Sequence, residues 1–216
     1  MTTARPLRKD AVRNRAALLE AARTVFAERG LDASLDDVAH EAGVGVGTAY
    51  RHFANKYELA EAIMREAVEQ IVALAHESGE IDDPLDGLVH FLEGSCVAQI
   101  ANRGLHEVLM GMHDASLANE ASQRLVAPLS NLVERAHASG ALRPEIEVSD
   151  VGVVILCLTT IADVTGEVSA QVWRRYLPIF LDGLRTGSPL PVPAISVEQM
   201  RGAFASYKER TARIHR

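Results

Sequence analysis

The stretch SLDDVAHEAGVGVGTAYRHF, residues 34–53, carries the signals of two short helices joined by a tight turn. Ser34 is a favourable residue for capping the first helix, and the acids that follow it suit the positive end of the helix dipole. Gly43 permits the turn, and a second helix is expected over 46–53. This length and order predict a helix-turn-helix, whose second helix lies in the major groove of DNA.

The glycines of GVGVG, residues 43–47, raise the alternative of a phosphate-binding loop. The dinucleotide motif GxGxxG would need a third glycine where Thr48 stands, and the P-loop GxxxxGK[ST] is not matched either. Both motifs follow a strand, whereas the residues before Gly43 have the pattern of a short helix. The helix-turn-helix is therefore favoured, and a helix hairpin without a ligand remains the alternative.

Most of the remaining chain also has the apolar spacing of helices. A first helix is expected over about 10–29, with Val12 at the start of its apolar stripe, and Phe53 is expected to face inward and hold the second helix of the helix-turn-helix against it. Asn55 can cap a fourth helix. Further helices are expected over roughly 83–102, 104–114, 117–138, 149–165, 169–186 and 196–210. No sustained strand alternation is seen, so the predicted fold is all-α, with an N-terminal three-helix unit followed by a larger helical bundle.

Charge divides the chain into regions. The net charge of −7 argues by itself against a nucleic-acid binder, but residues 61–188 hold 8 basic against 19 acidic side chains, hence −11. The basic excess lies near the two ends of the chain, where it can meet phosphates. The expected regions are a basic N-terminal arm (1–12), the helix-turn-helix domain (13–60), an acidic helical domain (61–188), and a Pro-rich linker and tail (189–216).

Two further features concern the cellular compartment. Cys96 and Cys157 lie far apart in apolar surroundings, which predicts buried free thiols rather than a disulfide framework. The N-terminus lacks a long apolar segment, and the run at 151–162 is too short to span a bilayer. A cytoplasmic location is expected.

The run RNRAALLEAARTVFAERGLDASLDDVAHEAGVGVGTAYRHFANKYEL, about 13–59, resembles the DNA-binding domain of TetR/AcrR-family transcriptional regulators. The resemblance implies a homodimer that binds double-stranded operator DNA, usually as a repressor, and that a small-molecule effector releases. By position, it implies that Val46, Gly47 and Arg51 approach base edges, and that Thr48, Tyr50, His52 and Lys56 contact phosphate or the groove. Asp36 and Asp37 depart from relatives that place a basic, base-reading residue there.

The resemblance fades in the second half of the chain, where it implies effector binding and a four-helix dimer interface. The interface or core anchors expected there are Trp173, Tyr176, Leu177, Phe180 and Leu184. Candidates for lining an apolar effector cavity with a few polar groups are Phe91, Cys96, Gln99, His106, Met110, His113 and Asp163.

Other functional classes find weaker support in the sequence. His106 and His113 are two helical turns apart, about 10 Å, which is too far to chelate one metal ion together. Glu134 and His137 give one ExxH motif where a di-iron bundle needs two. No metal, cofactor or catalytic set is therefore expected. The alternatives to a ligand-responsive regulator are a helical-bundle enzyme or metal-binding protein, and a non-specific nucleoid-type DNA binder.

Overall fold

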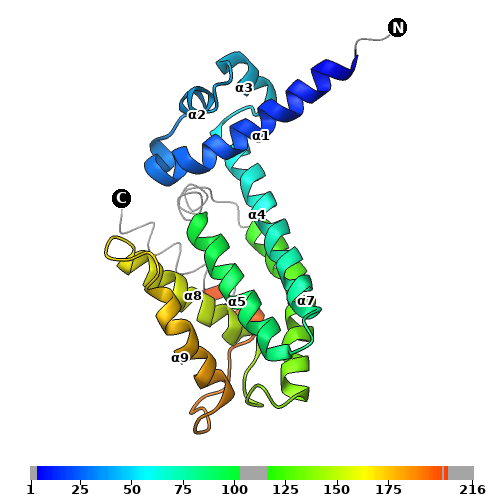
Figure 1. Ribbon diagram of the computed structural model, residues 1–216, viewed down its shortest axis with the longest axis vertical. Helices are drawn as coiled ribbons and strands as arrows, with labels where there is room; N and C mark the ends of the chain where they lie inside the picture. Colours follow the sequence, from blue (N-terminus) through cyan, green and yellow to red (C-terminus); the bar gives the residue numbers. More distant parts are fainter. Residues whose placement is uncertain (1–3, 103–115, 201, 204–216) are drawn as a thin grey trace. The chain divides into compact units, whose positions relative to one another are not determined.

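A computed structural model describes residues 4–102, 116–200 and 202–203, and its regular elements are helices (Figure 1). No strand occurs in these ranges, which confirms the all-α prediction. The elements, in chain order, are α1 (Ala4–Arg29), the 3₁₀ turn η1 (Gly30–Asp32), α2 (Leu35–Glu41), α3 (Val46–His52), α4 (Lys56–Gly79), α5 (Pro84–Ala101), α7 (Ser116–Ala138), α8 (Val148–Thr165) and α9 (Trp173–Arg185).

The described residues fall into two compact units, with the boundary between Ala67 and Val68 inside α4. Unit 1 contains α1, α2, α3 and the first half of α4. Unit 2 contains the second half of α4 together with α5, α7, α8 and α9. Each unit has its own cluster of buried apolar side chains, so each has a core of its own.

The core of unit 1 is built from small and medium-sized side chains where three short elements cross α1. Phe26 and Leu18 of α1 are fully buried, and alanines at 39 and 49 let α2 and α3 approach closely. Phe53, at the end of α3, is also buried in this cluster. The expectation that Phe53 faces inward and holds α3 against α1 is confirmed at the level of burial.

The caps predicted for unit 1 are present. Ser34 and Asp37 form a reciprocal capping box at the start of α2. Gly43 follows α2 with φ +62°, a left-handed conformation that favours glycine. The Asn55 side chain accepts hydrogen bonds from the backbone N–H groups of Tyr57 and Glu58, 2.9 and 3.0 Å away, and so caps α4.

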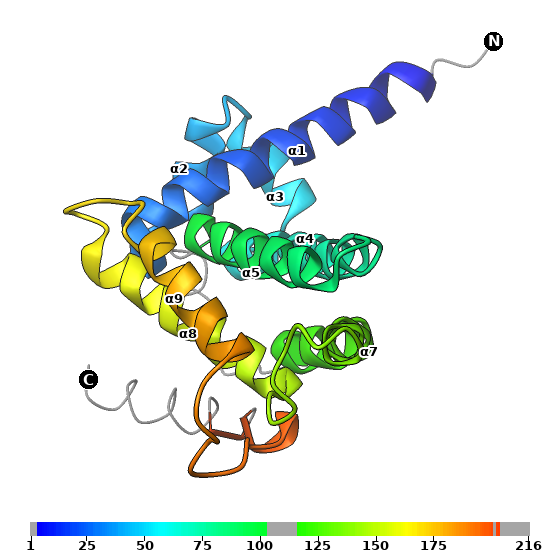
Figure 2. The same ribbon diagram turned by 60° about the horizontal axis from the view of Figure 1, so that its bottom comes forward.

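In unit 2, α8 lies between α5 and α9, as both ribbon views show (Figure 2). Its core combines Leu88 and Phe91 of α5, Leu132 of α7 and Leu158 of α8. The α8 helix is also the one described helix long and apolar enough to cross a bilayer by length and composition alone. Six of its residues are buried within unit 2.

Two arginines of unit 2 donate hydrogen bonds to backbone carbonyls at the ends of helices. The guanidinium of Arg135 on α7 donates to the carbonyl oxygens of Gly79, Ile81 and Asp82, where α4 ends. Arg143 donates to three carbonyls at and beyond the end of α9, including that of Ser188 at 3.0 Å. These bonds satisfy carbonyl groups that have no partner within a helix.

Several expected boundaries differ from the structure. The first helix begins at Ala4, not near residue 10, and the last long helix begins at Trp173 after a short run of turns. Val12 is 71% exposed, so the expected apolar stripe was wrong there, and the buried face of α1 starts at Leu18. The helix expected over 104–114 and most of that over 196–210 lie outside the described residues.

Candidate nucleic-acid interface

Burial fixes which face of α3 points outward. Ala49 is fully buried against unit 1, so the opposite side of this seven-residue helix faces solvent. Gly47, Tyr50 and Arg51 are exposed, whereas Val46 is half-buried and packs against the core. The structure therefore brings three of the expected contact residues onto one surface and commits Val46 partly to packing.

Arg51 differs from the other arginines of unit 1 whose side chains are described. Arg13, Arg15, Arg23, Arg29 and Arg65 each lie within 3.6 Å of a carboxylate oxygen in the same unit. Arg51 makes no ion pair or hydrogen bond with any described residue. Its guanidinium is therefore available to an external acceptor.

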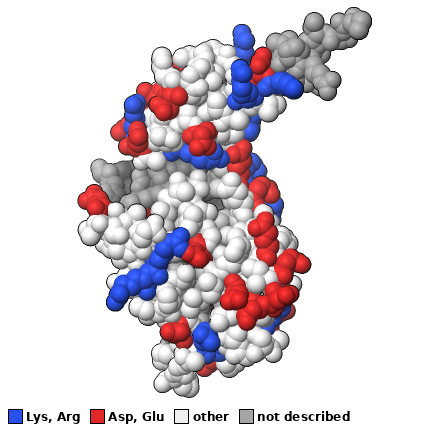
Figure 3. Space-filling model, in the orientation of Figure 1, with Lys and Arg blue, Asp and Glu red and all other residues white. Residues whose placement is uncertain are grey.

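This pairing can be followed on the molecular surface. On the face drawn in Figure 3, basic and acidic side chains of unit 1 lie next to one another. Glu66 of α4, for example, receives both Arg23, at 2.8 Å, and Arg15, at 3.6 Å. These pairs neutralise positive charge on α1, so the positive charge of unit 1 is not spread evenly.

Asp36, which the sequence marked as a departure, contacts the recognition surface through Tyr50. The Tyr50 hydroxyl donates a hydrogen bond to the Asp36 carboxylate, and this bond raises the pKa of Tyr50 above its ordinary 10.0. The phenol is thus held by α2 in the protein without DNA, and 51% of the Tyr50 residue remains exposed. The Tyr50 hydroxyl can contact a DNA phosphate only if its interaction with the Asp36 carboxylate is broken or shared with the phosphate.

Asp37 has a structural role. Its carboxylate accepts from the Ser34 hydroxyl and from the Ser34 backbone N–H, and Arg29 donates to its other oxygen at 3.0 Å. The hydrogen bonds from Ser34 hold the pKa of Asp37 below 3.8, with a smaller effect of Arg29 in the same direction. Asp37 therefore belongs to the start of α2.

The remaining predicted DNA contacts lie on both sides of the turn after α3. Thr48 and His52 are half-buried on α3. Lys56 begins α4, and its ammonium lies 5.5 Å from the centre of the Tyr57 ring. The sequence analysis did not single out Tyr57, although it is 41% exposed beside Lys56. An aromatic residue next to a basic one at a capped helix start was the available signal.

Of the residues predicted for an effector cavity, those that the structure describes divide between core and surface. Phe91 and Cys96 pack inside the core, where burial raises the pKa of the Cys96 thiol to about 11. Gln99 and Asp163 are exposed. His106, Met110 and His113 lie outside the described residues. Cys96 and Cys157 are both free thiols, and among the described residues no cluster of potential metal ligands occurs.

The expected interface anchors divide between core and surface. Trp173, Leu177 and Leu184 are buried in the core of unit 2, and Phe180 packs against it. Only Tyr176 is exposed to a sizeable degree. Sequence reasoning missed the outward apolar residues of the same helices, which are Val153, Leu156 and Val164 of α8 and Ile179 of α9. Their spacing of three and eight residues on α8 was the signal.

Comparison with known proteins supports a DNA-binding N-terminal unit followed by a C-terminal regulatory domain. Residues 18–63 match the model of bacterial regulatory proteins of the tetR family, and residues 83–186 match the C-terminal domain of SbtR-like transcriptional regulators. The structure superposes on the TetR transcription regulatory protein of Mycobacterium vanbaalenii with a TM-score of 0.64. That pair is 32% identical and covers 84% of this chain and 100% of the other.

Sequence relatives fall into two kinds. The helix-turn-helix-type transcriptional repressor KstR2 of Mycolicibacterium smegmatis is 27% identical over 77% of this chain and 88% of its own length. A helix-turn-helix-type regulator of Staphylococcus aureus is 44% identical, but the chain spans only 29% of its length. The similarity is thus strongest around the helix-turn-helix and extends, more weakly, through unit 2. The chain belongs to the TetR family of DNA-binding transcriptional regulators and is not an enzyme.

Proposed function

We propose that the protein is a dimeric repressor that binds a palindromic operator through α3 and leaves it when a small-molecule effector binds unit 2. The observation that carries the DNA-binding part is Arg51, exposed on α3 and without a partner among the described residues, while the neighbouring arginines are neutralised. An arginine in this state can donate two hydrogen bonds to a guanine edge. The family match supports the regulatory role.

The other residues have distinct proposed roles. Gly47 leaves open space on the surface of α3, so DNA can approach the backbone there. Thr48, His52 and Lys56 position the helix on phosphates, while Val46 contributes its exposed edge to base contact. Tyr50 contacts the groove with its ring, because Asp36 holds its hydroxyl. Residues 4–12, the basic start of α1, add contacts to the flanking DNA.

The dimer interface that we propose uses the outward faces of α8 and α9. Leu156 and Ile179 are 42% and 60% exposed, and α8 and α9 pack side by side. Exposed apolar side chains on two adjacent helices are typical of an interface between copies. Each α3 would then read one half-site, with the half-sites about 34 Å apart.

Effector binding within residues 68–188 would favour a dimer conformation in which the distance between the two α3 helices does not fit the operator. Such coupling between sites typically amounts to about 1–3 kcal/mol. Residues 189–216 form a C-terminal extension beyond this domain. We place the protein in the cytoplasm, where its operator DNA is found.

Selection of bound sequences from a random duplex pool, at near-physiological salt, tests the proposed function. An enriched inverted repeat is the expected result. Failure to enrich any sequence, with the protein folded and dimeric, would contradict sequence-specific binding and favour a non-specific DNA binder.

The interface has a separate test in Leu156→Asp, which places a charge on the proposed dimer face. We expect light scattering to report a monomer for this variant. Val12→Asp is the matched control, because it adds the same charge at an exposed apolar residue of unit 1 and should leave the dimer intact. An unchanged dimer in Leu156→Asp would exclude this face.

A further inference from the structure

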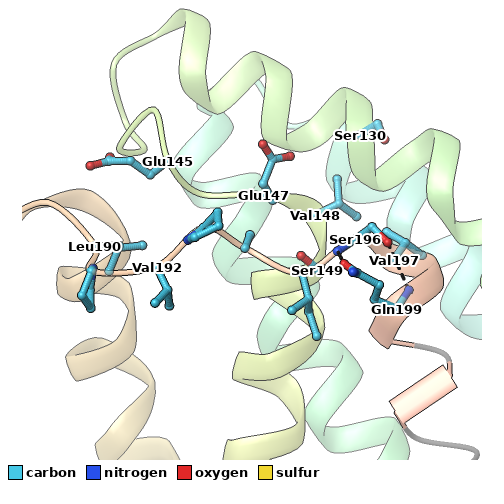
Figure 4. A pocket seen from close by; sticks show the side chains of 14 residues that line it. Ser130, Glu145, Glu147, Val148, Ser149, Leu190, Val192, Ser196, Val197 and Gln199 are labelled. Atoms are coloured by element: carbon cyan, nitrogen blue, oxygen red, sulfur yellow. Dashed lines mark hydrogen bonds between the residues drawn. The ribbon is translucent and has the colours of Figure 1, made fainter.

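A groove of about 800 Å³ lies where the segment after α9 crosses the start of α8 (Figure 4). One wall is the run from Leu190 to Gln199, which is extended as far as Ser196 and helical from Val197, and the other consists of residues 145–149 with Ser130 of α7. The volume is in the range of small-molecule sites. The segment from Leu190 onwards lies beyond residue 186, where the match to the C-terminal family domain ends, so the groove is built partly from an addition to that domain.

The extended run is held in place by specific contacts. Arg143 donates to the Ser188 carbonyl at 3.0 Å, immediately before the run begins. Gly187, with φ +143°, lies so close to this guanidinium that an added Cβ would come within 2.8 Å of it. At the far end, the Ser196 and Gln199 side chains each accept a hydrogen bond from the other's backbone N–H. Arg143 therefore fixes the start of the groove wall to the rest of unit 2, and the bonds between Ser196 and Gln199 order its far end locally.

The lining combines apolar surface with one sign of charge. Leu190, Val192 and Ile195 expose aliphatic side chains along the run, and Val148 at the start of α8 belongs to the same lining. The charged residues of the lining are Glu145 and Glu147, and none of its members is basic. The Nε of Arg143 lies 3.8 Å from Glu145, so this carboxylate is partly balanced, whereas Glu147 has no such cation among the described residues.

A buried hydroxyl lies in the same lining. Ser149 is 6% exposed, and its Oγ has no hydrogen-bond partner among the described residues. Figure 4 shows Ser149 between the crossing segment and the first turn of α8. A buried polar atom without a partner is rare in folded proteins and points to a missing one. Ser149 is thus an independent sign that the groove accepts a molecule with a hydrogen-bonding group.

We propose that this groove binds a small organic cation with an aliphatic tail, of the alkylammonium class. The ammonium would lie between Glu147 and the Ser149 hydroxyl, and the tail would cover the aliphatic residues of the extended run. An anion would meet two carboxylates, and a neutral alcohol would leave their charge unmatched.

Calorimetric titration of the full chain with n-hexylammonium, hexanol and hexanoate tests this proposal. We expect hexylammonium to bind about tenfold more tightly than hexanol, and hexanoate not to bind. Glu147→Gln removes the charge but keeps an oxygen able to cap α8, and we expect it to weaken hexylammonium binding by about tenfold. Glu80→Gln is the matched control, since it removes an exposed carboxylate at the end of α4 and should change nothing.

A second variant locates the site. Val192→Trp adds bulk at a side chain that is 69% exposed, so it should fold normally and obstruct the groove. Loss of hexylammonium binding in this variant is the expected result. Equal binding of all three probes, absence of binding at millimolar hexylammonium, or unchanged binding in both Glu147→Gln and Val192→Trp would each overturn the proposal.

Discussion

The two units share surface ion pairs, but arginines bonded to backbone carbonyls at helix ends are found among the described residues of unit 2 alone. In unit 1, arginines lie on the surface and pair with carboxylates of the same unit, for example Arg23 with Glu66 and Arg29 with Asp37. In unit 2, Arg124 and Arg174 likewise pair with Glu69 and Glu93. Arg135 and Arg143, by contrast, donate mainly to backbone carbonyls where helices end. Exposed ion pairs contribute at most about 1 kcal/mol each, whereas a carbonyl left without its donor keeps the full cost of desolvation. Arg135 and Arg143 should therefore matter to stability, whereas the paired arginines of unit 1 mainly set its charge distribution.

The largest effect on stability is expected from Arg135→Met, which keeps an aliphatic chain but leaves three carbonyls at the end of α4 without a donor. We expect the free energy of unfolding to fall by about 2–3 kcal/mol. Urea denaturation measures it. Arg65→Met removes an exposed pair within α4 and should cost less than about 0.5 kcal/mol. Equal losses of unfolding free energy in the two variants would contradict the distinction between carbonyl-bonding and ion-paired arginines.

A smaller effect is expected at the start of α2, where unit 1 relies on a side-chain cap. Ser34→Ala removes the hydroxyl that accepts from the Asp37 backbone N–H at 3.1 Å. We expect a loss of about 1 kcal/mol in the unfolding free energy. Ser196→Ala, at a similar cap in the extension after α9, serves as the control and should leave unit 1 unchanged. Amide hydrogen exchange of α2 would show whether the loss is local.

The charge of Asp36 is expected to affect DNA affinity and the pKa of Tyr50. Asp36→Asn removes a negative charge next to the recognition surface, so operator and random DNA should both bind more tightly, on the order of threefold. The pKa of Tyr50 should fall towards 10.0, because the carboxylate that accepts its proton is gone. NMR titration of labelled tyrosine measures this. An unchanged pKa would mean that Asp36 does not hold the hydroxyl.

The smallest effect concerns acid stability. The folded pKa of Asp37 lies below 3.8, so the unfolded state takes up its proton first as pH falls. The stability that Asp37 contributes is therefore complete above the ordinary carboxyl pKa and is lost as pH falls through the lowered value. The difference in unfolding free energy between the wild type and Asp37→Ala should shrink over that interval. A difference independent of pH would exclude an ionic contribution.

The sequence predicted the parts of the fold that depend on neighbouring residues. The caps at Ser34 and Asn55, the turn at Gly43 and the burial of Phe53 follow from local chemistry and are present. Val12 was misassigned because α1 extends beyond the elements that cover it, so an apolar residue at the right spacing meets solvent. Periodicity identifies a helix face but not whether another element reaches it.

The same limit holds for the functional sites: a local sequence pattern predicts which residues are exposed, but not which residues of other helices lie beside them. The exposure of Arg51 could be expected from the helix-turn-helix pattern, but its lack of a carboxylate depends on where the acids of other helices lie. In unit 2, Trp173 and Leu177 have the composition of interface anchors, yet they lie in the core, while less conspicuous residues such as Leu156 face outward. The groove beside Ser149 joins segments forty residues apart, which no local pattern reveals.

We propose that Arg51 reads DNA sequence while the other arginines of unit 1 whose side chains are described do not. The most direct test of this claim compares Arg51→Ala with Arg65→Ala for binding to the selected operator and to random duplex DNA, across a range of salt concentrations. We expect Arg51→Ala to weaken operator binding by about 1–3 kcal/mol more than random binding, and Arg65→Ala to affect neither by more than about 0.5 kcal/mol. Equal loss on both DNAs from Arg51→Ala would contradict the claim and assign Arg51 to phosphate contact.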